Sequence, residues 1–183
     1  MKILYLGPSS TICDYLKSFG EVTITEEKIE DVEFFSQFEW IVSYGYKYIL
    51  KSQHILAAKN SIINLHISYL PWNRGADPNY WSWVKSTPKG VTIHVIDEGI
   101  DTGDIFIQKI VDFSEQETLA SSYQKLKQEI EKLFMENFES ILTGVLLPKK
   151  QPKKGTLHYA KDFPGVDTWD INVKDLRKRK TIS

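Results

Sequence analysis

Short apolar runs alternate with segments of helical spacing along the first 70 residues of this chain. The runs predict strands at residues 2–6, 21–25, 40–44 and 61–65, and the intervening segments predict helices at 11–19 and 50–58. Buried strands that alternate with helices are typical of a mostly parallel sheet with helices on both faces. We therefore expect an α/β protein with a Rossmann-like, mostly parallel sheet.

The rest of the chain continues this pattern less regularly. It predicts a short helix at 78–84, with Asp77 as its cap and Pro78 at its first position, strands at 90–96 and 105–113, and a long helix at 117–143. A length of 183 residues, 42% of them apolar, fits one domain with a proper core. We expect one main domain over residues 1–147 and a short irregular C-terminal tail, 148–183, that wraps or extends the same domain.

Composition excludes several classes of protein. No apolar run approaches the roughly 18 residues of a membrane span, and the apolar N-terminal stretch is too short for a signal peptide, so we expect a cytoplasmic protein without a membrane partner. The single cysteine, Cys13, cannot form an internal disulfide or a cysteine-rich metal site and is expected to be buried.

The net charge of −1 is unevenly distributed. Residues 145–183 hold ten Lys and Arg against four Asp, a net +6, so residues 1–144 carry −7. The positive charge is clustered at 149–154 and 174–180. Few aromatic residues are interleaved with it, which favours a solvated tail over a nucleic-acid partner.

Polar residues stand at the predicted ends of two strands. Asn64 and His66 close the fourth strand on one face, and an acidic loop, 97–104, follows the fifth. Ligands of open α/β sheets bind beyond the carboxyl ends of the strands, so these groups are candidates for a site. The alternative is a structural histidine beside a turn-forming asparagine.

An amide, an imidazole and a carboxylate together suit acyl transfer. An imidazole can accept a proton at neutral pH, and a carboxylate can orient it. An amide can donate to an oxyanion, which is worth about 3 kcal/mol. No Ser or Cys nucleophile is evident beside them, which favours direct attack by a bound substrate.

Four segments resemble signature segments of the folate-dependent formyltransferases, over roughly residues 40–147. They are 64–71 (NLHISYLP), 74–75 (RG), 90–94 (GVTIH) and 100–105 (IDTGDI). The resemblance implies the formyltransferase fold, N10-formyl-tetrahydrofolate as co-substrate and no metal. It also implies a cis peptide bond before Pro71.

The same resemblance assigns roles to individual residues. It implies Asn64, His66 and Asp101 as the catalytic residues, with His94 as a further family histidine whose strand alternation also suits a structural role. The residues implied to contact the formyl donor are Tyr46, Lys47, Tyr48, Leu50, Ile96, Asp97, Glu98 and Ile100.

The acceptor amine is inferred from residues 70–83 and 155–159, which look like the compact sugar N-formyltransferases and the formylation domains of nonribosomal peptide synthetases. We expect a nucleotide-linked amino-dideoxy sugar, for example one destined for a surface glycan with a pseudaminic-acid-type sugar. The candidate substrate contacts are Ser9, Ser10, Trp72, Asn73, Arg74, Tyr80 and Trp81. The aromatic residues among them could equally be packed in the short helix, and Ser9 and Ser10 could be capping residues.

Three alternatives stay open. The acceptor could be glycinamide ribonucleotide, whose enzymes have a loop after the first strand that residues 7–11 match only in part. It could be methionyl-tRNA, whose enzymes carry an additional C-terminal RNA-binding domain. The protein could also be a non-catalytic module that binds folate or a nucleotide. The sequence does not indicate an oligomeric state.

Overall fold

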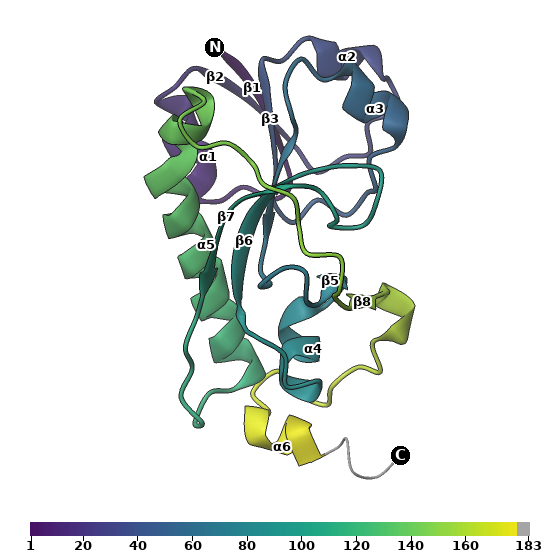
Figure 1. Cartoon of the computed structure of the whole chain (residues 1–183), viewed down its shortest axis with the longest axis vertical. Helices are drawn as coiled ribbons and strands as arrows, with labels where there is room; N and C mark the ends of the chain where they lie inside the picture. Colours follow the sequence, from purple (N-terminus) through teal and green to yellow (C-terminus); the bar gives the residue numbers. More distant parts are fainter. Residues whose placement is uncertain (179–183) are drawn as a thin grey trace.

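A six-stranded sheet forms the centre of the computed structural model, which describes residues 1–178 (Figure 1). Its strand order is β2-β1-β3-β4-β6-β7. The strands are β1 (Lys2–Leu6), β2 (Glu21–Thr25), β3 (Trp40–Ser43), β4 (Ile63–His66), β6 (Gly90–Val95) and β7 (Ile105–Ile110). The pairs among β1 to β4 are parallel, whereas β6 runs antiparallel to both β4 and β7. The predicted α/β class with a mostly parallel sheet is confirmed.

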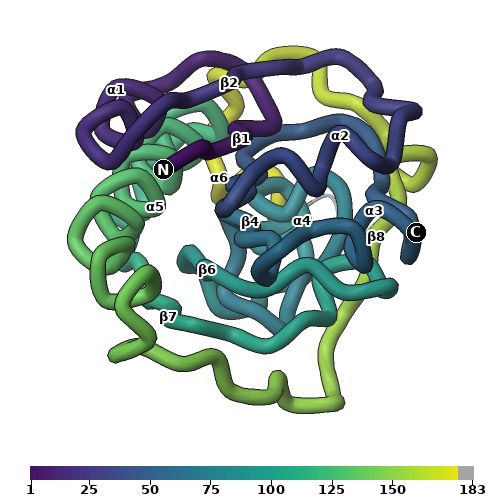
Figure 2. The backbone as a smooth tube through the Cα atoms, turned by 90° about the horizontal axis from the view of Figure 1, so that it is seen from above, coloured from purple at the N-terminus to yellow at the C-terminus, as the bar shows by residue number. Residues whose placement is uncertain are grey.

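Helices cover both faces of this sheet, because its inner strands bury side chains on both sides. Strand β1 directs Ile3 and Tyr5 to one apolar cluster and Leu4 and Leu6 to the other. Helices α1 (Thr11–Lys17) and α5 (Leu119–Leu142) lie over the first face, and the short helices α2 (Glu33–Ser36) and α3 (Ser52–Ala57) lie over the second (Figure 2). Cys13 on α1 is fully buried in the first cluster, as predicted.

Helix α5 is the long helix that the apolar spacing predicts. Its buried side chains are Leu119, Ser122, Leu126, Ile130, Leu133, Phe134, Phe138 and Ile141. The hydroxyl of Thr118 accepts a hydrogen bond of 3.0 Å from the backbone N–H of Ser121, and the Ser121 hydroxyl accepts one of 2.9 Å from the N–H of Thr118. This reciprocal cap fixes where the helix begins.

Helix α4 (Pro78–Val84) begins with Pro78 at its first position, as predicted. Asp77 precedes the helix at the cap position, as predicted. Its side chain makes no capping hydrogen bond, however, because its backbone is left-handed, with φ 51°, and not extended as at an ordinary cap. Tyr80, Trp81 and Trp83 pack in a third apolar cluster with residues of α6 (Val173–Lys178).

The segment after α5 returns along the sheet and carries short elements that the sequence did not indicate. Strand β8 (Leu157–His158) pairs in parallel with β5 (Arg74–Gly75), so residues more than 80 positions apart lie side by side. A single 3-10 turn, η1 (Ala160–Asp162), follows. The peptide bond between Leu70 and Pro71 is cis.

The basic C-terminal residues divide between described and undescribed parts of the chain. Lys174 forms an ion pair of 2.8 Å with Glu115. The end of the basic run, residues 179–180, lies outside the described residues. Among residues 1–178, no helix combines the length and the apolar character that crossing a membrane requires.

Candidate active site

Strand register brings Asn64 and His94 together at the end of the sheet. The two residues are directly opposite each other across the antiparallel pair of β4 and β6, and Asn64 Nδ2 lies 3.0 Å from His94 Nε2. His66 is two residues further along β4 and therefore points to the same face. The register of β4 against β6 and the alternation of side chains along β4 thus place three polar side chains on one face.

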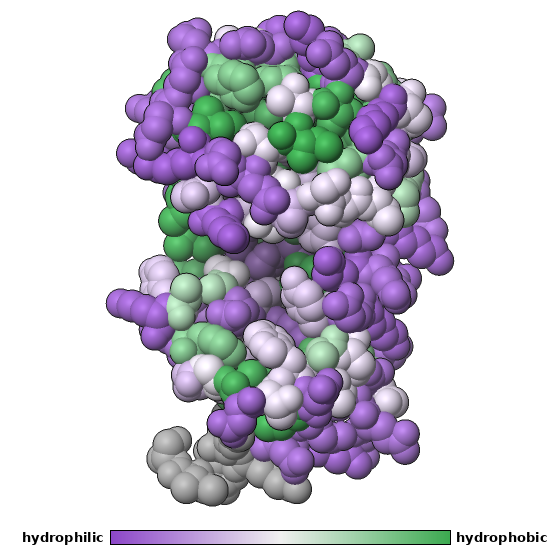
Figure 3. Space-filling model, turned by 180° about the vertical axis from the view of Figure 1, so that it is seen from behind, coloured by the Kyte–Doolittle hydropathy of each residue, from purple (hydrophilic) through white to green (hydrophobic). Residues whose placement is uncertain are grey.

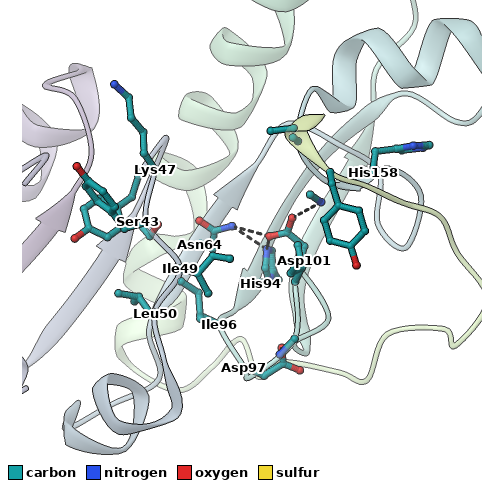
Figure 4. Close-up of a pocket in the computed structure, with 18 residues that line it drawn as sticks. Ser43, Lys47, Ile49, Leu50, Asn64, His94, Ile96, Asp97, Asp101 and His158 are labelled. Atoms are coloured by element: carbon teal, nitrogen blue, oxygen red, sulfur yellow. Dashed lines mark hydrogen bonds and ion pairs between the residues drawn. The ribbon is translucent and has the colours of Figure 1, made fainter. Parts of the chain in front are cut away.

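The loop after β6 adds Asp101 to this group (Figure 4). Its Oδ1 accepts a 3.3 Å hydrogen bond from Asn64 Nδ2 and lies 3.4 Å from His94 Nε2. Its Oδ2 accepts a 2.8 Å bond from the backbone N–H of Gly75 and lies 3.6 Å from His66 Nδ1. The predicted trio of Asn64, His66 and Asp101 therefore does meet in space, with His94 as a fourth member.

Backbone carbonyl groups fix where each neutral imidazole carries its proton, because a carbonyl can only accept. His94 Nδ1 lies 2.8 Å from the carbonyl oxygen of Val95, so Nδ1 donates and Nε2 accepts from Asn64. His66 Nε2 lies 3.2 Å from the carbonyl oxygen of Asn73, so Nε2 donates and Nδ1 has a free lone pair.

Burial and charge set the protonation states of the pair. Burial lowers the pKa of His66 below its ordinary value, and the opposing attraction of Asp101 does not cancel that effect. Burial alone would raise the pKa of Asp101. The attraction of His66 and the hydrogen bond from Gly75 outweigh it and hold the pKa well below its usual range. At neutral pH the pair is a neutral imidazole beside a carboxylate.

Two cavities meet at this cluster. The larger cavity has a volume of about 380 Å³ and the smaller one about 350 Å³. Both are lined by Tyr46, Asn64, Gly75 and Asp101, and His66 faces only the smaller one. Seen from behind, the surface is hollowed near the level of β5 and β8 (Figure 3). Two separate molecules could therefore reach the same few polar atoms from different sides.

Most of the residues predicted to contact the formyl donor line the larger cavity. They are Tyr46, Lys47, Tyr48, Leu50, Ile96, Asp97 and Ile100. The structure does not place Glu98 among its lining residues. Ser9 and Ser10 line the smaller cavity, and the Ser10 hydroxyl also accepts a 3.3 Å bond from the N–H of Ile12, which makes it the cap of α1.

The other candidate substrate contacts, Trp72, Asn73, Arg74, Tyr80 and Trp81, line neither cavity. Asn73 is fully buried, and its amide donates a 2.7 Å bond to Thr87. Trp81 stacks on His158 with ring centres 4.2 Å apart. The side chains of Asn73, Arg74, Tyr80 and Trp81 have partners within the protein, and a substrate contact for all five residues stays a prediction.

Several lining residues were missed from the sequence. Ser43, His158, Tyr159 and Ala160 line the larger cavity, and Tyr123 and Lys127 line the smaller one. Ser43 ends β3 and could have been found by the strand-end rule. His158 reaches the site only through the pairing of β8 with β5, which no local pattern signals.

Within residues 1–178, no group of three or more His, Cys, Asp and Glu side chains is arranged to hold a metal ion. The polar groups present are those of proton transfer and hydrogen bonding.

Comparison with known proteins identifies the family of this chain. The family model described as formyl transferase matches residues 11–138. The crystal structure of the formyltransferase PseJ from Anoxybacillus kamchatkensis, in complex with UDP-4,6-dideoxy-4-formamido-L-AltNAc and tetrahydrofolate, superposes with a TM-score of 0.92. It is 44% identical, and the match covers 98% of this chain and 100% of that one.

Curated relatives act on different acceptors. A methionyl-tRNA formyltransferase from Thermodesulfovibrio yellowstonii is 32% identical over 161 residues, which is 82% of this chain and 51% of that protein. A dTDP-4-amino-4,6-dideoxyglucose formyltransferase from Mycobacterium tuberculosis is 32% identical over 112 residues, 61% of this chain and 48% of that protein. The chain thus spans about half the length of these relatives. From the family match and the assembled site, the chain belongs to the formyl transferase family.

Proposed function

We propose that this protein transfers a formyl group from N10-formyl-tetrahydrofolate to the primary amine of a nucleotide-linked amino-dideoxy sugar. The observation that carries the proposal is the meeting of two cavities at Asn64 and Asp101. A two-substrate transfer needs such a junction, because donor carbon and acceptor nitrogen must come within bonding reach. PseJ, with 44% identity, holds both a tetrahydrofolate and a UDP-linked formamido sugar.

The lining of each cavity supports a proposal for its occupant. The larger cavity has aromatic and aliphatic side chains, among them Tyr46, Tyr48 and Ile100, which suit the flat ring system of a folate. The smaller cavity is lined by His66 and by Lys127. It therefore offers a base for an amine and a positive charge for a nucleotide phosphate. This assignment places donor and acceptor on opposite sides of Asp101.

His66 acts first as a base. The amine nitrogen forms a bond to the formyl carbon while the carbonyl π electrons move to the formyl oxygen, and Nδ1 of His66 accepts the proton that the nitrogen loses. Asp101 stabilises the resulting imidazolium across the 3.6 Å between Nδ1 and Oδ2. His66 then returns the proton to N10 as the bond between N10 and the formyl carbon breaks. The products are the formamido sugar and tetrahydrofolate.

Asn64 stabilises the negative charge on the formyl oxygen. Its NH₂ group donates to His94 at 3.0 Å and to Asp101 at 3.3 Å, and the longer bond is the weaker of the two. Both N–H directions are fixed in the plane of the amide, so the hydrogen with the longer contact to Asp101 can be shared with an oxyanion that lies in its path while the bond to His94 is kept. Such a donor contributes about 3 kcal/mol to transition-state stabilisation.

The test offers the purified protein N10-formyl-tetrahydrofolate with each of four acceptors: a UDP-linked and a dTDP-linked 4-amino-4,6-dideoxy sugar, glycinamide ribonucleotide and methionyl-tRNA. We expect mass spectrometry to show the gain of one CO unit on a nucleotide sugar, dependent on the donor. Asp101→Asn serves as the matched control for spontaneous formylation. If only methionyl-tRNA or only glycinamide ribonucleotide is formylated, that molecule is the acceptor and the proposal of a sugar acceptor is wrong. If no acceptor is formylated, the result favours a non-catalytic binding module.

A further inference from the structure

The side chain of Gln151 connects two segments that hold Asp101. Its Nε2 donates to the carbonyl oxygens of Asp101, at 2.9 Å, and Gly103, at 2.7 Å. Its Oε1 accepts from the guanidinium group of Arg74, at 2.8 Å from Nη2 and 3.3 Å from Nε. The NH₂ group and the oxygen of the Gln151 amide therefore both form hydrogen bonds to residues close to the Asp101 carboxylate.

Both segments bear directly on the position of the Asp101 carboxylate. Asp101 has a left-handed backbone, with φ 50°, a conformation that is less favourable for Asp than for Gly and that hydrogen bonds to its backbone help to hold. The bond from Gln151 to the Asp101 carbonyl acts on that backbone. On the other side, Arg74 precedes Gly75, whose N–H binds Oδ2 of Asp101. Gln151 thus links the backbone of Asp101 to Arg74, the neighbour of the residue that donates a hydrogen bond to the Asp101 carboxylate.

Gln151 itself lies outside the reacting groups. It lines neither cavity, and it follows the region matched by the family model, which ends at residue 138. Its chain segment is anchored without the side chain. On one side, Lys149 and Ile105 exchange two backbone hydrogen bonds of 2.8 Å; on the other, the N–H of Arg74 donates to the carbonyl of Thr156 at 2.9 Å. The segment around Gln151 therefore does not depend on the side-chain amide for its attachment, and the amide bonds act on the surroundings of Asp101.

We infer that Gln151 is a positioning residue for Asp101 in the formyl transfer, an inference that rests on the proposed function. It acts by keeping Oδ2 of Asp101 in line with Nδ1 of His66, so that the imidazolium forms beside its counter-charge. A displacement of the order of 1 Å at a group of this kind lowers the rate by up to about a hundredfold.

The deciding variant is Gln151→Glu, which keeps the size of the side chain. A carboxylate still accepts from Arg74, and more strongly, but it repels the two carbonyl oxygens to which the amide donated. We expect Tm to be retained, kcat to fall about tenfold or more, and KM for both substrates to stay within about twofold of wild type. Gln128→Glu, the same change at an exposed position of α5, should match wild type in all three quantities.

A second variant covers the case in which the new carboxylate disturbs folding. Gln151→Met fills the same space without hydrogen bonds and should show the same loss of kcat with unchanged KM. The NMR signals of the His66 imidazole give a readout independent of turnover, and they should shift in both Gln151 variants and not in Gln128→Glu. The inference is overturned if a folded Gln151 variant keeps both its kcat and its His66 signals. A rise in KM without a fall in kcat also overturns it, and so does the unfolding of both variants. Absence of transfer by the wild type would instead count against the proposed function.

Discussion

Nδ1 of His66 and Oδ2 of Asp101 lie 3.6 Å apart, and at most 15% of either side chain is exposed. In this setting the carboxylate matters most when the imidazole becomes charged, because water cannot replace it as a counter-charge. The pair is therefore arranged for a proton that arrives and leaves during each turnover.

Replacing either member should abolish most of the activity. We expect His66→Ala and Asp101→Asn each to lower kcat by a factor of at least about 100, the first by removing the base and the second by removing its counter-charge. Steady-state kinetics measure the loss, and circular dichroism checks that both variants are folded. Turnover near that of wild type in either folded variant would contradict the assigned roles.

The pH dependence of kcat/KM should show an acid limb set by His66. Only the neutral imidazole can accept the proton, and burial lowers the pKa of His66 from its ordinary value of 6.5. Activity should therefore fall as the pH drops through a midpoint below 6.5 and reach a plateau on the alkaline side of that midpoint. The pKa of the acceptor amine is measured separately, so that its contribution to the pH profile of kcat/KM can be subtracted. A midpoint above 6.5 would show that another group titrates.

Gly75 should tolerate no side chain. Its φ is +84°, and an added Cβ would lie 2.2 Å from the carbonyl oxygen of His158. We expect Gly75→Ala to lower the free energy of unfolding by more than about 1 kcal/mol and to lower kcat as well, because the N–H that binds Asp101 must move. Thermal unfolding and steady-state kinetics measure the two effects.

Gly144→Ala is the matched control for that variant. Gly144 has a similar φ of +70°, but nothing lies within 4 Å of its added Cβ. It should lose about 1 kcal/mol of stability from the backbone conformation alone and keep its kcat. Equal kcat in the two variants would show that Gly75 does not influence the site.

The two cavities should respond separately to substitution. Tyr48 lines only the larger cavity and Lys127 only the smaller one. We expect Tyr48→Ala to raise KM for the folate several-fold and Lys127→Met to raise KM for the nucleotide sugar, each with the other KM unchanged. Lys132→Met is the control for the loss of one positive charge, because Lys132 is an exposed residue on α5, the helix that also carries Lys127. The reverse pattern would exchange the occupants of the cavities.

Sequence patterns were informative where they repeat. The strands and the helices α1 and α5 follow from apolar spacing, and Asn64, His66 and Asp101 follow from strand ends and the family resemblance. Helix α2 has only four residues, and β5 and β8 have two each, so none of them carries a measurable period. Such elements form because of what they pack against.

The aromatic residues show a second limit of the sequence. Residue type cannot distinguish a tryptophan that stacks on a substrate from one that stacks on another part of the chain, as Trp81 stacks on His158. The same holds for Gln151, because a polar residue in a basic segment gives no sign of distant partners. Both facts depend on the path of the chain after α5, which is a property of the whole fold.

The pairing of β8 with β5 has a consequence for biosynthesis. Chains are made from the N-terminus, and folding can begin during synthesis, so all six strands of the main sheet leave the ribosome before residues 151–158 do. The nascent protein can thus form its main sheet while β5, which holds Gly75, still lacks its neighbour. A chain cut short before Gln151 would keep all six strands of that sheet and lack the residues that complete the surroundings of Asp101.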